Sequence, residues 1–136
     1  MLVIPFSAKD LATVKMRAMT GGVLEKLSTL EALAGHVWQA CTCAINSQPD
    51  DTVQLLYAMD VRDCLDPPLL KGFVGNTLYS ACARATCEKV RKQPLSFCVK
   101  EIQKANKKSQ MSISGSVQIQ YFHTCWLSLF CLSFTW

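Results

Sequence analysis

Two histidines, His36 and His123, are the side chains of this sequence best suited to acid–base chemistry, because imidazole titrates near neutral pH. His36 lies at the edge of an apolar helical stripe, and no acidic residue stands one helical turn from it. His123 lies in an uncharged segment that offers it no partner. A nucleophile and its base must lie within reach of one another. We therefore interpret His36 as a packing or solvent-facing residue and assign no partner to His123.

Eight cysteines are many for 136 residues, and their spacing bears on metal, disulfide and buried-thiol roles. A structural zinc site needs four thiolate or imidazole ligands in closely spaced pairs. Cys41 and Cys43 form the one tight pair, and residues two apart on the expected helix point in different directions. No signal peptide is visible, so nothing indicates a secreted disulfide framework. We predict no metal site, mostly buried and inert thiols, and a reducing, cytoplasmic location.

Two other polar groups have simple structural explanations. Ser28 and Glu31 have the Ser-x-x-Glu spacing of a capping box, which accounts for Ser28 without a ligand, although a helix N-terminus also attracts phosphate. Asp60, Asp63 and Asp66 lack the glycine and the terminal glutamate of a calcium loop. We expect these aspartates to form turns beside the prolines that follow.

The charge balance is mild, with fourteen Lys and Arg against ten Asp and Glu and a formal net charge of +4. One group of basic residues falls late in the charged part of the chain: Lys89, Arg91, Lys92, Lys104, Lys107 and Lys108. No aromatic residues alternate with them as in a surface that stacks nucleic-acid bases. We therefore predict a solvated face and no nucleic-acid partner.

The charges also divide the chain, because all of them lie between Lys9 and Lys108. Such a break in composition predicts a boundary, with a patterned body over residues 1–108 and an uncharged, apolar tail over 109–136. The stretch from Val117 to Trp136 is long enough to cross a bilayer. It contains two glutamines and His123, so a membrane anchor is the alternative that we do not favour.

The apolar pattern of the body predicts the order helix, helix, strand, strand, helix, which indicates a mixed α/β (α+β) fold. A capped first helix precedes Gly21-Gly22, and a second follows Ser28 with one apolar stripe: Leu30, Leu33, Ala34, Val37, Trp38, Cys41 and Ile45.

The two strands and the last helix follow this stripe. Thr52 to Asp60 is apolar on both faces, which predicts an interior strand. A loop around Pro67-Pro68 leads to a second strand over 73–85, and a last helix runs from Pro94 to Ala105.

The body resembles the plant BAHD acyltransferases over residues 3–106. The strongest segment is Leu65-Asp-Pro-Pro-Leu69 with Gly72-Phe-Val-Gly-Asn76, which is similar to the family's L-x-P-P-L-P-x-G-Y-F-G-N. Four further segments match in order and spacing: Val14 to Met19, Ser28 to Trp38, Leu55 to Arg62 and Pro94 to Ile102. Lys15 to Met19 and Val23 to Lys26 look closest to the branch that acylates long-chain hydroxy acids or alcohols with hydroxycinnamoyl groups.

The resemblance implies part of a chloramphenicol-acetyltransferase-like domain. It implies transfer of an acyl group, in this branch hydroxycinnamoyl, from acyl-CoA to an alcohol, with acyl-CoA as cosubstrate and no tightly bound cofactor. Ser28 and Thr29 match positions near the CoA channel of the family. Arg62, Gly75 and Asn76 match positions whose role we take to be structural. The oligomeric state is left open.

The departures from the family concern its catalytic base. Family members use a histidine in an H-x-x-x-D motif to deprotonate the acceptor, and they carry a D-F-G-W-G motif. His36 is followed by Ala40 and His123 by Leu127, so neither fills the first motif, and the second is also missing. We therefore expect an internal fragment with no catalytic residue and no activity alone. The alternatives are a noncatalytic fragment that binds a longer relative, and a tail-anchored membrane protein.

Overall fold

The computed structural model describes residues 4–22, 24–62, 65, 69–114 and 130–134. Its elements follow one another as α1 (Ala8–Met19), α2 (Thr29–Ala44), β1 (Thr52–Asp60), β2 (Leu78–Thr86), α3 (Cys87–Lys92), α4 (Leu95–Ser114) and β3 (Phe130–Phe134). The predicted mixed α/β class is confirmed, as is the order of the two helices and two strands that open the chain.

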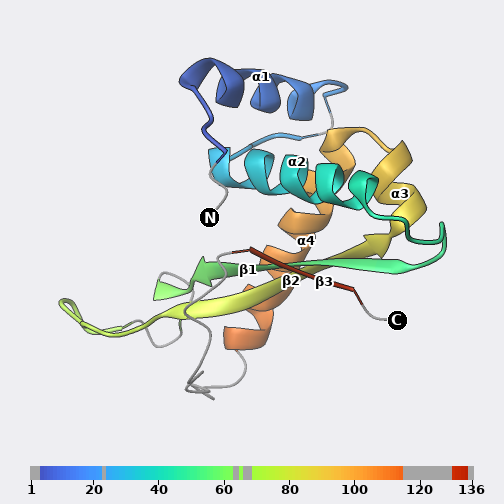
Figure 1. The fold of residues 1–136 in the computed structure, drawn as a ribbon. Coiled ribbons are helices and arrows are strands. Elements are labelled where there is room, and N and C mark those ends of the chain that lie inside the picture. Colours follow the sequence, from blue (N-terminus) through green and yellow to red (C-terminus); the bar gives the residue numbers. More distant parts are fainter. Residues whose placement is uncertain (1–3, 23, 63–64, 66–68, 115–129, 135–136) are drawn as a thin grey trace.

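The three described strands form one antiparallel sheet in the order β2-β1-β3 (Figure 1). Strand β1 has the bounds that the apolar pattern predicts and is the central strand, where Leu55 pairs with Ala83 on one side and with Leu132 on the other. Its Val53, Leu55 and Tyr57 are buried, but Ala58 on the opposite face is exposed. The prediction that both faces of β1 are buried was therefore only partly correct.

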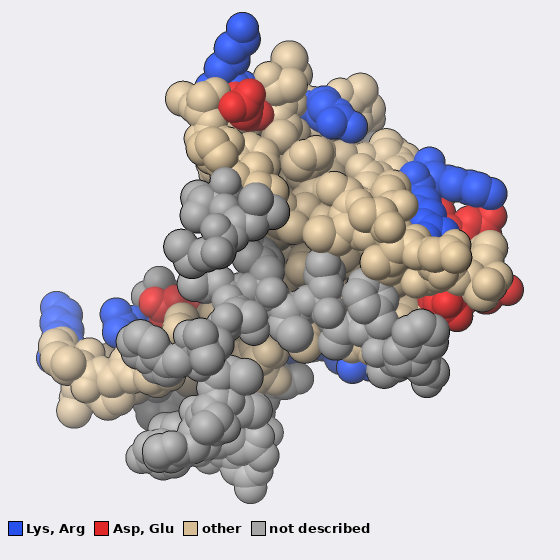
Figure 2. Space-filling model, in the orientation of Figure 1, with Lys and Arg blue, Asp and Glu red and all other residues tan. Residues whose placement is uncertain are grey.

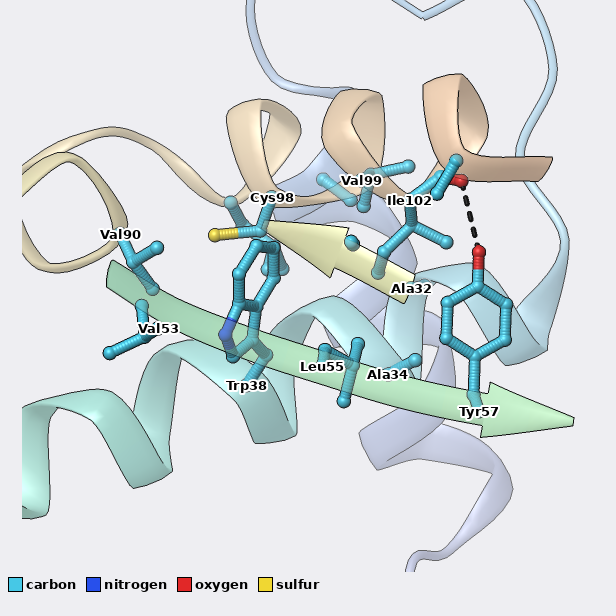
Figure 3. Close-up of a cluster of buried hydrophobic side chains, with 14 of the residues drawn as sticks. Ala32, Ala34, Trp38, Val53, Leu55, Tyr57, Val90, Cys98, Val99 and Ile102 are labelled. Atoms are coloured by element: carbon cyan, nitrogen blue, oxygen red, sulfur yellow. Dashed lines mark hydrogen bonds between the residues drawn. The ribbon is translucent and has the colours of Figure 1, made fainter. Parts of the chain in front are cut away.

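The core lies between the buried face of the sheet and the pair of helices α2 and α4 (Figure 3). Trp38 of α2 is fully buried and belongs to the same buried cluster as Leu55 of β1 and the α4 residues Cys98 and Ile102. Its indole Nε1 has no hydrogen-bond partner in the described part of the chain. Burying a large apolar side chain is worth about 1.5–3 kcal/mol, so residues of this size dominate the stability of a small core.

Local capping explains where the first two helices begin. Ser7 with Asp10 and Ser28 with Glu31 form reciprocal capping boxes at α1 and α2, as their spacing predicts. Helix α1 ends before Gly21, which has a φ of 97°. Residues with a Cβ rarely adopt this backbone conformation. Leu30 was wrongly placed in the apolar stripe of α2, since it is 56% exposed.

The second half of the chain differs from the expected elements at three points. Strand β2 begins at Leu78 rather than at Phe73, and a short helix, α3, follows it directly. The amide of Cys87 donates to Asp51 O (2.8 Å), and this bond fixes the start of α3 beside the loop before β1. Helix α4 runs to Ser114, well past Ala105.

The division of the chain at residue 108 stays a prediction, although α4 crosses it and β3 pairs with β1 beyond it. Among the described residues, no helix has the length and apolar character needed to cross a membrane. Most of the stretch considered as an anchor, residues 117–129, lies outside the described part of the chain.

Gly35 lets α2 approach α4 closely. A Cβ built at Gly35 would lie 3.3 Å from Val99 Cγ2 and 3.5 Å from Cys98 Cβ. We expect Gly35→Val to destabilise the fold by about 2 kcal/mol because its methyl groups overpack this contact. Ala40→Val, at an exposed position of the same helix, is the matched control and costs about 0.5 kcal/mol through helix propensity. Urea unfolding followed by circular dichroism measures both, and equal stability of the two variants would contradict the packing argument.

Candidate functional site

The N-terminus of α2 carries the two residues that the resemblance places near the CoA channel. Ser28 Oγ accepts from the Glu31 amide (3.1 Å), and the Ser28 amide donates to Glu31 Oε2 (2.9 Å). The capping role predicted for Ser28 is therefore confirmed. Thr29, the first residue of α2, is exposed, and its Oγ1 lies 3.5 Å from Lys15 Nζ.

Two neighbouring helices hold this helix end in place. Lys15 reaches it from α1, while Gln103 of α4 donates through Nε2 to Lys26 O (2.9 Å) and to Glu31 Oε2 (3.4 Å). The ammonium of Lys15 and the N-terminal end of the helix dipole favour an anion, and the carboxylate of Glu31 opposes one. The sequence did not reveal Gln103 or Lys15, because both contacts join segments that are distant along the chain.

The connection from β1 to β2 brings together the other residues that match the family. Arg62 Nη2 donates to Gly75 O (3.3 Å), and Asn76 Oδ1 accepts from the Leu78 amide (3.1 Å). Asp60 Oδ1 accepts from the Arg62 amide (3.1 Å) and from Thr77 Oγ1 (2.8 Å). These bonds close the base of the hairpin, which fits a structural role for Arg62, Gly75 and Asn76.

Of the three aspartates Asp60, Asp63 and Asp66, only Asp60 lies in the described part of the chain. The amide of Arg62, the hydroxyl of Thr77 and the nearby guanidinium hold the pKa of the Asp60 carboxyl below its ordinary value of 3.8. Asp63 and Asp66 lie outside the described residues. Among the described residues, no three His, Cys, Asp or Glu side chains are grouped so as to hold a metal ion.

Tyr57 is a buried polar side chain that the sequence pattern did not single out. Its hydroxyl lies 2.6 Å from Asn106 Oδ1 and 3.1 Å from Ile102 O, and so joins β1 to α4 (Figure 3). Burial, with the charge of Glu31 nearby, raises the pKa of Tyr57 well above its ordinary value of 10.0. Tyr57 therefore stays protonated at neutral pH and acts as a structural donor.

His36 and Arg91 have structural partners. His36 is half-buried, and its ring meets that of Phe6 edge-on at 6.5 Å, so the packing interpretation is confirmed. His123 lies outside the described residues. The guanidinium of Arg91 donates to the carbonyl oxygens of Thr42, Ile45 and Ser47 and closes the C-terminal end of α2.

Two lysines of the basic group form ion pairs on the surface. Lys92 pairs with Glu88 at 2.7 Å and Lys104 with Glu101 at 2.6 Å, both within one turn of helix. Ion pairs as exposed as these contribute little to stability. With Arg91, three of the six basic residues are therefore engaged in bonds within the chain, while Lys89, Lys107 and Lys108 are exposed.

The Transferase family matches residues 1–135, so the chain belongs to this family, whose plant BAHD acyltransferases the sequence resembles.

Three plant relatives illustrate the range of acceptors named in the family. Agmatine hydroxycinnamoyltransferase 1 of Oryza sativa subsp. japonica is 28% identical over 75% of this chain, and benzyl alcohol O-benzoyltransferase of Nicotiana tabacum is 31% identical over 60%. Fatty alcohol:caffeoyl-CoA acyltransferase of Arabidopsis thaliana is 31% identical over 74%. The matched parts cover only 23%, 18% and 22% of these relatives, so the chain spans less than a quarter of their length.

The lowered pKa of Asp60 gives the hairpin an acid-sensitive contact. Its charged form is favoured in the folded state, so its stabilising effect is present above pH 3.8 and is lost as the pH falls through the lower folded pKa. We expect Asp60→Asn to be less stable than the parent at pH 7 and the difference to shrink below about pH 4. Asp50→Asn, on an exposed turn, is the control. Urea unfolding at several pH values measures the effect, and a difference independent of pH would refute it.

The described thiols should differ in reactivity according to burial. Cys43 is exposed and Cys98 is fully buried on α4, where burial raises the pKa of the Cys98 thiol to about 12. We expect iodoacetamide at pH 8 to modify Cys43 quickly and Cys98 only after unfolding, since the thiolate is the reactive form. Peptide mapping by mass spectrometry gives the two rates, and equally fast labelling of both in the native protein would show that this core is open.

Proposed function

We propose that this chain forms one part of an acyltransferase that moves a hydroxycinnamoyl group from acyl-CoA to an alcohol. The observation that carries the proposal is the family match over residues 1–135. The names of two relatives point to the donor, one a hydroxycinnamoyltransferase and one a caffeoyl-CoA acyltransferase. We propose the cytoplasm as the location and acyl-CoA as a cosubstrate, with no tightly bound cofactor.

The acceptor is the less constrained half of the proposal. The relatives' names include a fatty alcohol and benzyl alcohol, but also the amines agmatine and spermidine. We favour a long-chain alcohol because the segments from Lys15 to Met19 and from Val23 to Lys26 look closest to that branch. An amine is the competing acceptor, and the two differ in the base strength that deprotonation requires.

Ser28 and Thr29 are the residues that we propose to lie near bound CoA. Thr29 is exposed beside Lys15, whose ammonium suits a phosphate. Gln103 and Glu31 fix the backbone around Ser28, so this helix end is preorganised for contact with a ligand.

The chemistry needs a general base that this chain does not offer. A histidine must take the proton of the acceptor hydroxyl as that oxygen attacks the thioester carbonyl. His36 packs against Phe6, and neither His36 nor His123 has an aspartate four positions later. We propose that the chain contributes to the fold and to binding, with the base supplied by residues outside it.

Acyl transfer from caffeoyl-CoA to hexadecanol, followed by mass spectrometry of the ester, tests both parts of the proposal. We expect the purified chain to give no product above the buffer rate, with the Arabidopsis acyltransferase as positive control. A chimera of that enzyme, in which the 100 matched residues are replaced by the corresponding part of this chain, should form the ester. Turnover by the chain alone would show that the chain contains its own general base. A folded but inactive chimera would count against the acyltransferase role.

A further inference from the structure

Exposed apolar side chains gather on the connection between β1 and β2. Half of the large, exposed apolar residues among the described ones fall within positions 70–79, here called the arm: Leu70, Phe73, Val74, Leu78 and Tyr79. Leu70 is 85% and Val74 97% exposed. The arm projects beyond the helices in the yellow-green part of the chain (Figure 1). Exposed apolar side chains concentrated in one segment are typical of an interaction site.

The arm is ordered by its own hydrogen bonds. The Phe73 amide donates to Leu70 O (3.0 Å), with Gly72 at a φ of 87° inside this turn. On one side of the hairpin Thr77 Oγ1 donates to Asp60 Oδ1 (2.8 Å). On the other side Arg62 Nη2 donates to Gly75 O (3.3 Å). The arm therefore loses little conformational entropy when a partner covers it, which favours binding.

The last two apolar residues of the arm lie in the sheet. Leu78 and Tyr79 belong to β2, an edge strand with no second neighbour in the described sheet. The open edge presents unpaired backbone groups to another strand. A loop that inserts into lipid needs apolar residues only at its tip, so an apolar surface that runs on to a sheet edge favours a protein partner.

Cations flank this surface. Arg62 and Lys71 are both exposed, and Lys and Arg side chains stand at the projecting end of the hairpin (Figure 2). The partner surface that complements the arm is thus an apolar depression with an acidic rim.

We propose that the arm and the adjoining edge of β2 form the surface against which the complementary part of a Transferase-family fold packs. The inference rests on the proposed function, because the relatives contain more than three quarters of their length beyond the part that this chain matches. The occupant is an acyltransferase polypeptide that adds a strand beside β2 and buries Leu70, Phe73 and Val74.

Binding between the full chain and a complementary probe tests this surface. The probe is rice agmatine hydroxycinnamoyltransferase 1 from which the 102 matched residues have been deleted, immobilised for biolayer interferometry. We expect binding that Leu70→Asp and Val74→Asp each weaken at least tenfold. Met16→Asp on α1, a residue 69% exposed, is the matched control and should change the affinity less than twofold. A folded probe that does not bind, or binding that the arm variants leave intact, overturns the proposal.

Two other occupants are distinguished by the same variants. Self-association of the full chain that Val74→Asp abolishes in sedimentation velocity would assign the surface to a second copy. Flotation with phosphatidylserine vesicles that Val74→Asp abolishes would assign it to lipid. Either result overturns the proposal while leaving the acyltransferase role, tested by ester formation, untouched.

A labelling experiment covers the case in which the probe does not fold. Val74→Cys is expected to react with maleimide at least tenfold more slowly in the chimera with the Arabidopsis enzyme than in the free chain, because the chimera covers the arm. Met16→Cys is the control and should react equally in both. Equal labelling of Val74→Cys in both proteins overturns the proposal.

Discussion

The close packing of α2 on α4 is the contact on which the rest of the structure depends. Gly35 removes the side chain that would hold these helices apart, and Trp38, one turn later, fills the space between them and the sheet. Because α4 also packs on β2, this one contact sets the position of both helices relative to the sheet. The N-terminus of α2, with Ser28 and Thr29, is carried by the same helix and takes its place from it.

Hydrogen bonds then fix the positions of the strands and helix ends around this contact. The Tyr57 hydroxyl joins the central strand to α4, and Gln103 joins α4 to the start of α2. At the other end of α2, Arg91 binds three carbonyl oxygens, which would otherwise lack partners after the helix ends. Each of these groups would be costly to bury alone, so together they select one relative placement of the elements.

The sequence predicted the features that short-range chemistry determines. The Ser-x-x-acid spacings located the starts of α1 and α2, and the apolar run from Thr52 to Asp60 located β1 with correct bounds. The role of Ser28 as a cap followed from the same local rule. Positions set by distant partners did not follow: Leu30 points outward at the first turn of α2, and Lys15 reaches Thr29 only because α1 folds back onto α2.

The place of β1 at the centre of the sheet has a consequence for synthesis on the ribosome. Leu55 pairs with Ala83 of β2 and with Leu132 of β3. Strand β1 is therefore synthesised before both of its neighbours, and β3 is the later of the two to become available. Pairing between segments so far apart is slow, and an uncovered strand invites wrong partners in the meantime. A nascent chain of this kind would draw on chaperones until β3 leaves the exit tunnel.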